Sequence, residues 1–104
     1  MIFATARRGS NWPIGGGHVP PPADKPWVFV HLAPDASTPP RFFVLTQAEL
    51  HSILAPGDAK YRANYLAKHG EEYGDRAGVV TLTVKDAEPH LGKWMTIVRM
   101  VNAV

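Results

Sequence analysis

The stretch of sequence that decides the fold is Trp27-Val28-Phe29-Val30-His31-Leu32. It is rich in β-branched and aromatic residues and is bounded by Pro26 and Pro34, which together predict a largely buried strand. A second run of the same kind, Arg41-Phe42-Phe43-Val44-Leu45, follows a connection that is rich in proline. The simplest arrangement of the two runs is an antiparallel hairpin with a long loop, and we expect it to lie at the centre of the sheet.

The residues after this hairpin carry the signals of two short helices. Thr46 and Glu49 have the spacing of a capping box, in which each side chain bonds the backbone N–H of the other residue. A first helix is therefore predicted over residues 46–55, and the step Pro56-Gly57 is expected to end it. An aspartate then caps a second helix, predicted over residues 58–69, with a glycine directly after it.

The C-terminal part contains one clear strand and one ambiguous segment. Residues 79–84 alternate between two sides, with Val80, Leu82 and Val84 on one of them, which is typical of a strand. Residues 86–89 have the pattern of a helix start with proline in the first turn. Residues 96–101 are β-branched enough to form a strand, so both structures stay open for the tail.

Together these elements predict one α+β domain over residues 1–104, with a small, mainly antiparallel sheet and two short helices. A length of 104 residues is a common size for one domain. The density of glycine and proline in residues 9–26 predicts a long loop there.

The composition excludes several classes of protein. Hydrophobic residues make up 45% and charged residues 19% of the chain, which argues against a wholly disordered protein. The net charge of +2 is too small to mark a nucleic-acid or membrane surface by itself. There is no cysteine, and no apolar run approaches the roughly 18 residues of a membrane span. We therefore expect a cytoplasmic protein without a membrane partner.

The order of several motifs resembles that of a known family. Residues 5–14, Thr-Ala-Arg-Arg-Gly-Ser-Asn-Trp-Pro-Ile, precede the aromatic strands at 27–32 and 42–46 and a late Trp94. This order is similar to the C-terminal part of a poorly characterised bacterial family with a restriction-endonuclease-like fold of the PD-(D/E)XK type. The resemblance implies that fold for most of the chain.

The same resemblance implies that the catalytic residues of such nucleases are missing. In these enzymes an Asp and a Glu hold Mg²⁺, and a Lys two residues after the Glu positions or activates the attacking water. When the chain is registered on Thr5 and Trp12, Ala4 falls at the Lys position and Ile2 at the Glu or Gln position. Neither side chain can do this chemistry. We therefore expect no catalytic residue, no metal and no other cofactor.

The resemblance further implies a truncated domain, because Met1 lies inside the motif strand and the Asp-bearing strand has no counterpart. The chain is either a shortened, degenerate paralogue or the product of a start codon assigned too far downstream. Both explanations leave Ala4 at the Lys position, so both favour a non-catalytic protein.

One cluster of residues has the chemistry of nucleic-acid binding. Arg7, Arg8, Ser10, Asn11 and Trp12 combine cations, hydroxyl and amide donors and a ring that could stack on an unpaired base. These five residues are the candidate nucleic-acid-binding site, although such residues are also common in ordinary loops.

The remaining motifs favour structural interpretations. The five histidines are dispersed and lack the spacing of a zinc site. The glycines at 15–17 lack the ending of a phosphate-binding loop, and Trp94 with its neighbouring methionines is typical of a core.

The sequence therefore predicts a non-catalytic, truncated nuclease-like domain that binds nucleic acid or a partner chain. The alternatives are a metal-dependent nuclease completed by another chain and a purely structural or interaction module. Because the strand at residues 2–6 would have an open edge, we also expect a homodimer whose interface includes residues near 2–7 and strand residues of the hairpin.

Overall fold

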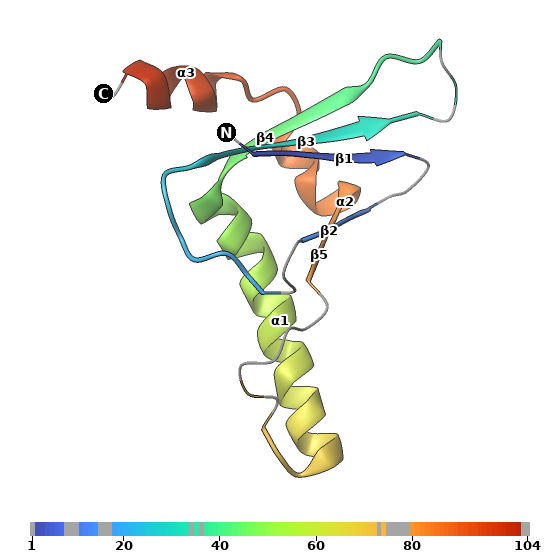
Figure 1. Ribbon diagram of the computed structural model, residues 1–104, viewed down its shortest axis with the longest axis vertical. Helices are drawn as coiled ribbons and strands as arrows, with labels where there is room; N and C mark the ends of the chain where they lie inside the picture. Colours follow the sequence, from blue (N-terminus) through green and yellow to red (C-terminus); the bar gives the residue numbers. More distant parts are fainter. Residues whose placement is uncertain are drawn as a thin grey trace.

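The strand predicted from Trp27 to Leu32 is the middle strand of a three-stranded sheet. In the computed structural model, which describes residues 2–7, 11–14, 18–33, 35, 37–72, 74 and 80–102, the strand order is β1-β3-β4. Strand β3 (Pro26–Leu32) pairs antiparallel with β4 (Arg41–Thr46), which confirms the predicted hairpin. On its other side β3 pairs in parallel with β1 (Ile2–Arg7). Figure 1 shows the three strands side by side.

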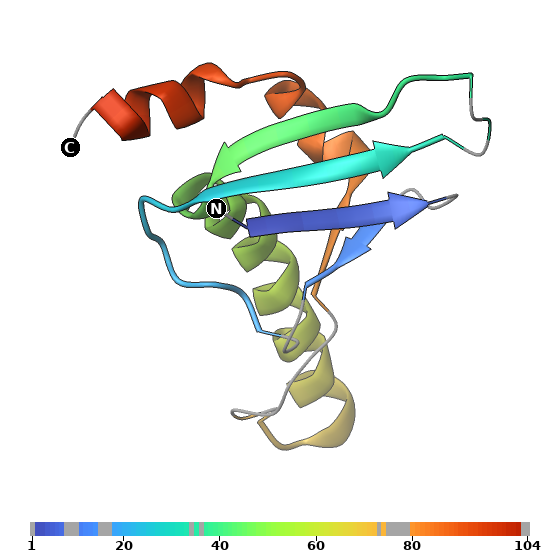
Figure 2. The same cartoon turned by 45° about the horizontal axis from the view of Figure 1, so that its top comes forward.

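A second, two-stranded sheet lies beneath the first (Figure 2). It pairs β2 (Asn11–Pro13) with β5 (Thr81–Thr83) in antiparallel register, with Trp12 opposite Leu82. The predicted alternation around β5 is confirmed, because Val80, Leu82 and Val84 are all buried. Two of the three strand pairings are antiparallel, so the fold is a small α+β fold with mainly antiparallel sheets.

The hydrophobic core lies between the two sheets and the first half of helix α1 (Gln47–His69). Phe29 and Phe43 are partners in the β3–β4 register and are fully buried on the face that points toward α1. The other buried side chains of this core come from β2 and the residue after it, from β4 and α1, from β5 and the residue before it, and from the segment after β5: Trp12, Ile14, Leu45, Leu50, Leu54, Val80, Leu82, Val84 and Ala87.

Helix α1 corrects the prediction of two short helices. The capping box at its start is confirmed, since the Thr46 hydroxyl accepts from the Glu49 N–H at 3.0 Å and the Glu49 carboxylate accepts from the Thr46 N–H at 2.9 Å. The predicted break at Pro56-Gly57 is wrong: the helix runs without interruption to His69 and is capped by Gly70 at a φ of 73°.

The helix continues because both of its halves are fixed by contacts. Proline lacks the N–H that would bond the carbonyl four residues earlier, which costs about 3 kcal/mol in a helix interior. Before Pro56, Leu50 and Leu54 are anchored in the core. After it, Asp58 forms an ion pair with Arg62 at 3.0 Å instead of capping a new helix, and Arg62 also donates to the carbonyl of Gly74.

The proline-rich segment before β3 is tied to the start of α1 by a buried glutamine. The Gln47 amide nitrogen donates to the carbonyl of Pro21 at 2.7 Å, and its amide oxygen accepts from Trp27 Nε1 at 3.2 Å. The backbone N–H groups of Gln47 and Ala48 donate to the carbonyls of Lys25 and Ala23. Residues 18–25 are thus irregular, as their composition predicts, and still have fixed partners. The predicted loop over residues 9–26 is wrong at Asn11–Pro13, which form β2.

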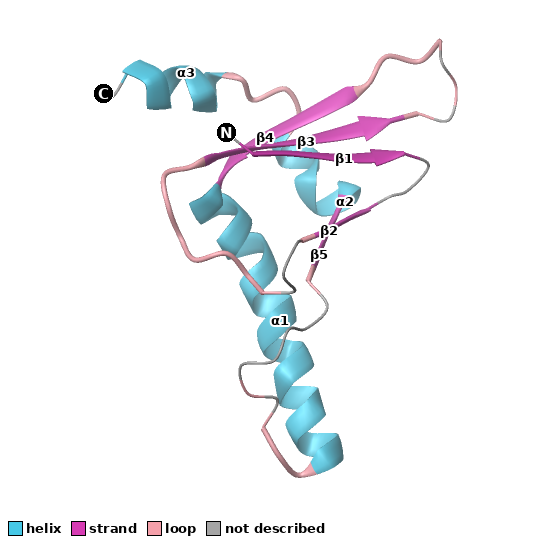
Figure 3. Cartoon of the chain, viewed as in Figure 1, coloured by secondary structure: helices cyan, strands magenta, loops and turns pink. Residues whose placement is uncertain are grey.

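The C-terminal segment is helical rather than extended (Figure 3). The short helix α2 (Val84–Ala87) begins at Thr83, earlier than predicted, and leads into a 3₁₀ turn, η2 (Glu88–His90), that contains the proline. Helix α3 (Met95–Asn102) then covers the face of the main sheet that α1 does not, near β3 and β4 (Figure 1). The strand alternative for residues 96–101 is therefore wrong.

The two ends of α1 have different surroundings. Its N-terminal half packs on the sheet, whereas its C-terminal half extends away from it (Figure 1), and the buried residues of the helix all lie in its first eight positions. None of the described helices is long and apolar enough to cross a membrane.

Candidate interaction surfaces

The five residues of the predicted nucleic-acid site are divided by the fold. Arg7 is the last residue of β1, and exposed Asn11 is the first residue of β2. Arg8 and Ser10 lie outside the described residues. Trp12, in contrast, is a core residue.

Trp12 is held from several sides at once. Its side chain is 1% exposed, and its ring lies 5.2 Å from that of Phe29 and 5.5 Å from that of Phe43, measured between centroids. Its indole N–H donates to the carbonyl of Val30 at 3.2 Å. A buried tryptophan with a satisfied N–H stabilises the fold, and its ring faces are not accessible to a base.

The two outer strands of the main sheet, β1 and β4, differ in what contacts their outer edges. Among the described residues, β1 pairs with β3 alone. The edge of β4 is covered instead by the segment before α3. There Phe43 forms a bridge with Leu91, and the Gly92 N–H donates to the Phe42 carbonyl at 2.8 Å.

Four apolar side chains in and just before the start of α3 are exposed, and we call these residues the α3 surface: Leu91, Trp94, Met95 and Val98. Their exposed fractions lie between 43% and 58%. The prediction that Trp94 is a core residue is therefore wrong. Its ring packs against that of Phe42 of β4, at a centroid distance of 5.6 Å.

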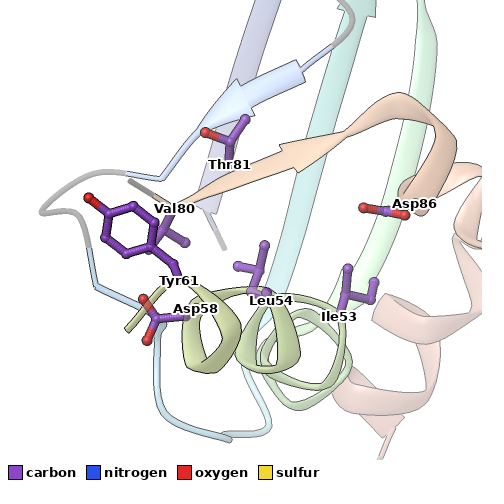
Figure 4. A pocket seen from close by; sticks show the side chains of 8 residues that line it. Ile53, Leu54, Asp58, Tyr61, Val80, Thr81 and Asp86 are labelled. Atoms are coloured by element: carbon purple, nitrogen blue, oxygen red, sulfur yellow. The ribbon is translucent and has the colours of Figure 1, made fainter. Parts of the chain in front are cut away.

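A hollow of about 440 Å³ opens between the middle of α1 and strand β5 (Figure 4). Ile53, Leu54 and Val80 form its apolar floor. Leu54 and Val80 are buried. The polar groups of its lining come from α1, β5 and α2: Asp58, Tyr61, Thr81 and Asp86.

Two carboxylates elsewhere have clear structural roles. The Asp35 carboxylate accepts from the Ser37 hydroxyl at 2.7 Å, the Ser37 N–H at 2.8 Å and the Thr38 hydroxyl at 2.8 Å in the β3–β4 loop. These hydrogen bonds from Ser37 and Thr38 lower the pKa of Asp35 below its usual value. Glu49 lies 3.5 Å from His90 Nδ1, which links the start of α1 to the 3₁₀ turn.

The described residues contain no group of three or more His, Cys, Asp or Glu side chains that could hold a metal ion. The histidines have separate surroundings: His51 lies 3.0 Å from the Pro20 carbonyl, and His31 lies 3.3 Å from Arg41.

Sequence reasoning missed both the α3 surface and the hollow. Within α3, Met95 and Val98 are three residues apart, and a helical interpretation of the tail could have placed these two residues on one face. The hollow joins residues 53–61 to residues 80–86, and no local pattern contains that contact.

No family model, no curated protein and no solved structure matches this chain.

Proposed function

We propose that this protein is a non-catalytic interaction module that assembles as a homodimer through the open edge of β1. The observation that carries the proposal is the sheet order β1-β3-β4, in which β1 has one neighbour among the described residues. An edge strand with free backbone groups is a ready template for another strand.

A second copy of the chain is the partner that such an edge fits most simply. Two identical β1 strands related by a twofold axis pair antiparallel, and each then satisfies the backbone groups of the other. The two sheets would join into one continuous sheet across the dimer. The other sheet edge is not available for this pairing, because Leu91 and Gly92 cover it.

The α3 surface supports an interaction role independently of β1. Exposed apolar side chains that lie together are uncommon on monomers without partners, whereas single exposed apolar residues are ordinary. Leu91, Trp94, Met95 and Val98 lie within eight residues of one another. The non-catalytic part of the proposal rests on Ile2 and Ala4, which occupy the positions where the resembled nucleases need a carboxylate or amide and a lysine.

The experiment uses two neighbouring proline substitutions, Ala4→Pro and Thr5→Pro. Successive N–H groups of a strand point to opposite sides, so one of these prolines removes a donor to β3 and the other removes a donor from the open edge. The wild-type chain should have about twice the monomer mass of 11.4 kDa by light scattering at micromolar concentration. The variant altered at the open edge should stay folded by circular dichroism and become monomeric.

The other proline variant serves as the matched control, since it should lose thermal stability through the β1–β3 pairing. A wild-type chain that is monomeric at micromolar concentration contradicts the proposal. So does a dimer that survives both substitutions in folded protein.

Nucleic-acid binding is the second candidate, supported by the exposure of Asn11 and by the position of Arg7 at the end of the edge strand. The candidate residues that remain for it are Arg7, Arg8, Ser10 and Asn11. If both arginines contact phosphates, replacing them with alanine should reduce the slope of log K against log salt by about two units on duplex nucleic acid. An unchanged slope rules this function out.

A further inference from the structure

The hollow between α1 and β5 combines features that none of the proposed interactions uses. Its volume of about 440 Å³ lies within the range of sites for small molecules, roughly 300–1,000 Å³. Its floor is apolar, formed by Ile53, Leu54 and Val80, and it can bury part of a hydrocarbon or a ring.

Gly57 keeps this hollow open. It lies inside α1 and lines the hollow, and a Cβ added to it would meet no atom within 4 Å. Glycine is a costly residue inside a helix, by about 1 kcal/mol relative to alanine. Nothing in the local packing requires a glycine here, so its effect on the surface is to leave space beside Tyr61.

The charged side chains in the described lining are acidic, although the chain as a whole has a net charge of +2. Asp58 and Asp86 line the hollow, and its described lining contains no Lys or Arg. In Figure 4 the two carboxylates lie at opposite ends of the row formed by Leu54 and Ile53.

The two carboxylates differ in how far their charge is compensated. Asp58 is ion-paired with Arg62 at 3.0 Å. Asp86 is exposed, and among the described residues no hydrogen bond or ion pair reaches its carboxylate, while its backbone N–H donates to the Thr83 hydroxyl. Asp86 is therefore the carboxylate of the lining that has no charge partner among the described residues.

We propose that this hollow binds a small organic cation with an apolar body, an arylalkyl ammonium in chemical terms. The apolar body would lie on Leu54 and Val80, and the ammonium group would lie at the Asp86 end of the hollow. Tyr61, which is 41% exposed, lines the other end of the hollow. The lining thus selects against anions through charge and against strongly polar ligands through its floor.

The experiment titrates the chain with three probes of nearly the same shape: 2-phenylethylammonium, neutral 2-phenylethanol and anionic 3-phenylpropionate. Backbone amide resonances of Leu54, Gly57 and Thr81 report on the hollow in ¹H–¹⁵N NMR spectra. The ammonium should shift these resonances with saturation, the alcohol should bind about two- to fivefold more weakly, and the carboxylate should bind most weakly.

Two variants test the assignment of roles. Asp86→Asn should weaken the ammonium about two- to fivefold and leave the alcohol unchanged, whereas Asp24→Asn, the same change at an exposed site outside the lining, should alter neither. Gly57→Leu should occupy part of the hollow, weaken the binding of both probes and leave the chain folded.

Several results would overturn the proposal. They are the absence of saturable shifts at these amides with any probe, equal affinities for the three probes, and unchanged binding in Gly57→Leu. Dimer formation through β1 involves none of these residues, so the outcome does not depend on the oligomeric state.

Discussion

At the scale of single residues, Trp12 and Trp94 exchange the roles that their sequence contexts suggest. Trp12 follows two arginines, a serine and an asparagine, which favours a binding loop, and yet it is 1% exposed. Trp94 lies among methionines and β-branched residues, which favours a core, and yet it is 43% exposed. The difference arises because β2 brings Trp12 under Phe29 and Phe43, contacts that are distant in sequence.

This contrast gives a prediction for stability. Replacing Trp12 with alanine should destabilise the protein by about 3–5 kcal/mol, because it removes a fully buried ring. Trp12→Phe keeps much of the ring and loses the bond to the Val30 carbonyl, so a smaller loss of about 1 kcal/mol is expected from that bond. Urea unfolding measures both, with Trp94→Ala as the control. A larger loss for Trp94→Ala than for Trp12→Ala would show that the core is assigned wrongly.

A second prediction at this scale concerns Asp35 and pH. Because hydrogen bonds from Ser37 and Thr38 lower the pKa of Asp35 in the folded chain, its contribution to stability is present above the unfolded value of 3.8 and is lost as pH falls through the lower folded value. The Ser37 amide resonance should therefore change over that acidic range. In Asp35→Asn this titration should be missing. A Ser37 amide that responds to acid equally in both proteins would contradict the assignment.

At the scale of elements, α1 shows how a strong local signal is outweighed. A Pro-Gly step usually ends a helix, and here it is followed directly by Asp58, a residue that favours the start of a new helix. In the structure, anchored side chains on both sides of Pro56 keep the axis continuous, and Asp58 bonds Arg62 one turn later. The local sequence of residues 46–69 is compatible with two short helices and with one long helix. Tertiary contacts decide which of the two arrangements forms.

The continuity of α1 predicts that Pro56→Ala is stabilising. The substitution restores the backbone donor to the carbonyl of residue 52 and removes the ring clash, so the free energy of unfolding should rise by up to about 3 kcal/mol. Thermal and urea unfolding give the value, and Pro89→Ala in the 3₁₀ turn is the matched control, where little gain is expected. If Pro56→Ala leaves stability unchanged or lowers it, the helix is broken at this residue as the sequence suggests.

The β3–β4 hairpin is the opposite case, because the strands predicted from the local sequence are the strands found in the structure. The register pairs Phe29 with Phe43 and Val28 with Val44, and all four side chains are fully buried. Such strands are buried on both faces, which explains why their sequences are nearly continuous apolar runs. Both long strands could therefore be predicted from composition alone.

At the scale of the whole molecule, β1 has one paired neighbour among the described residues, and four exposed apolar residues lie in and just before α3: Leu91, Trp94, Met95 and Val98. Both features support the proposed association with another chain. The resemblance to nucleases suggested by the sequence would separately place Ile2 and Ala4 where metal-dependent chemistry needs polar side chains.

A prediction for the whole molecule follows from those two residues. With Mg²⁺ or Mn²⁺ added, the purified chain should cleave neither single-stranded nor double-stranded DNA above the level of buffer. Gel electrophoresis of labelled DNA measures cleavage. A contaminating nuclease is recognised because its activity separates from the protein on a size-exclusion column. Cleavage that follows the protein and is lost in one of its own point variants would show that the chain, or its dimer, is an enzyme.

The sequence by itself determined the hairpin, the start of α1 at its capping box and the alternation around β5, because these depend on side chains that are near neighbours along the chain. Only the tertiary structure decided the burial of Trp12, the continuity of α1 and the exposure of Trp94. It also decided the parallel position of β1 and the hollow beside Gly57. Each of these depends on contacts between segments far apart in sequence, and the free energy of such contacts can exceed the local preference of a proline, a tryptophan or a β-branched run.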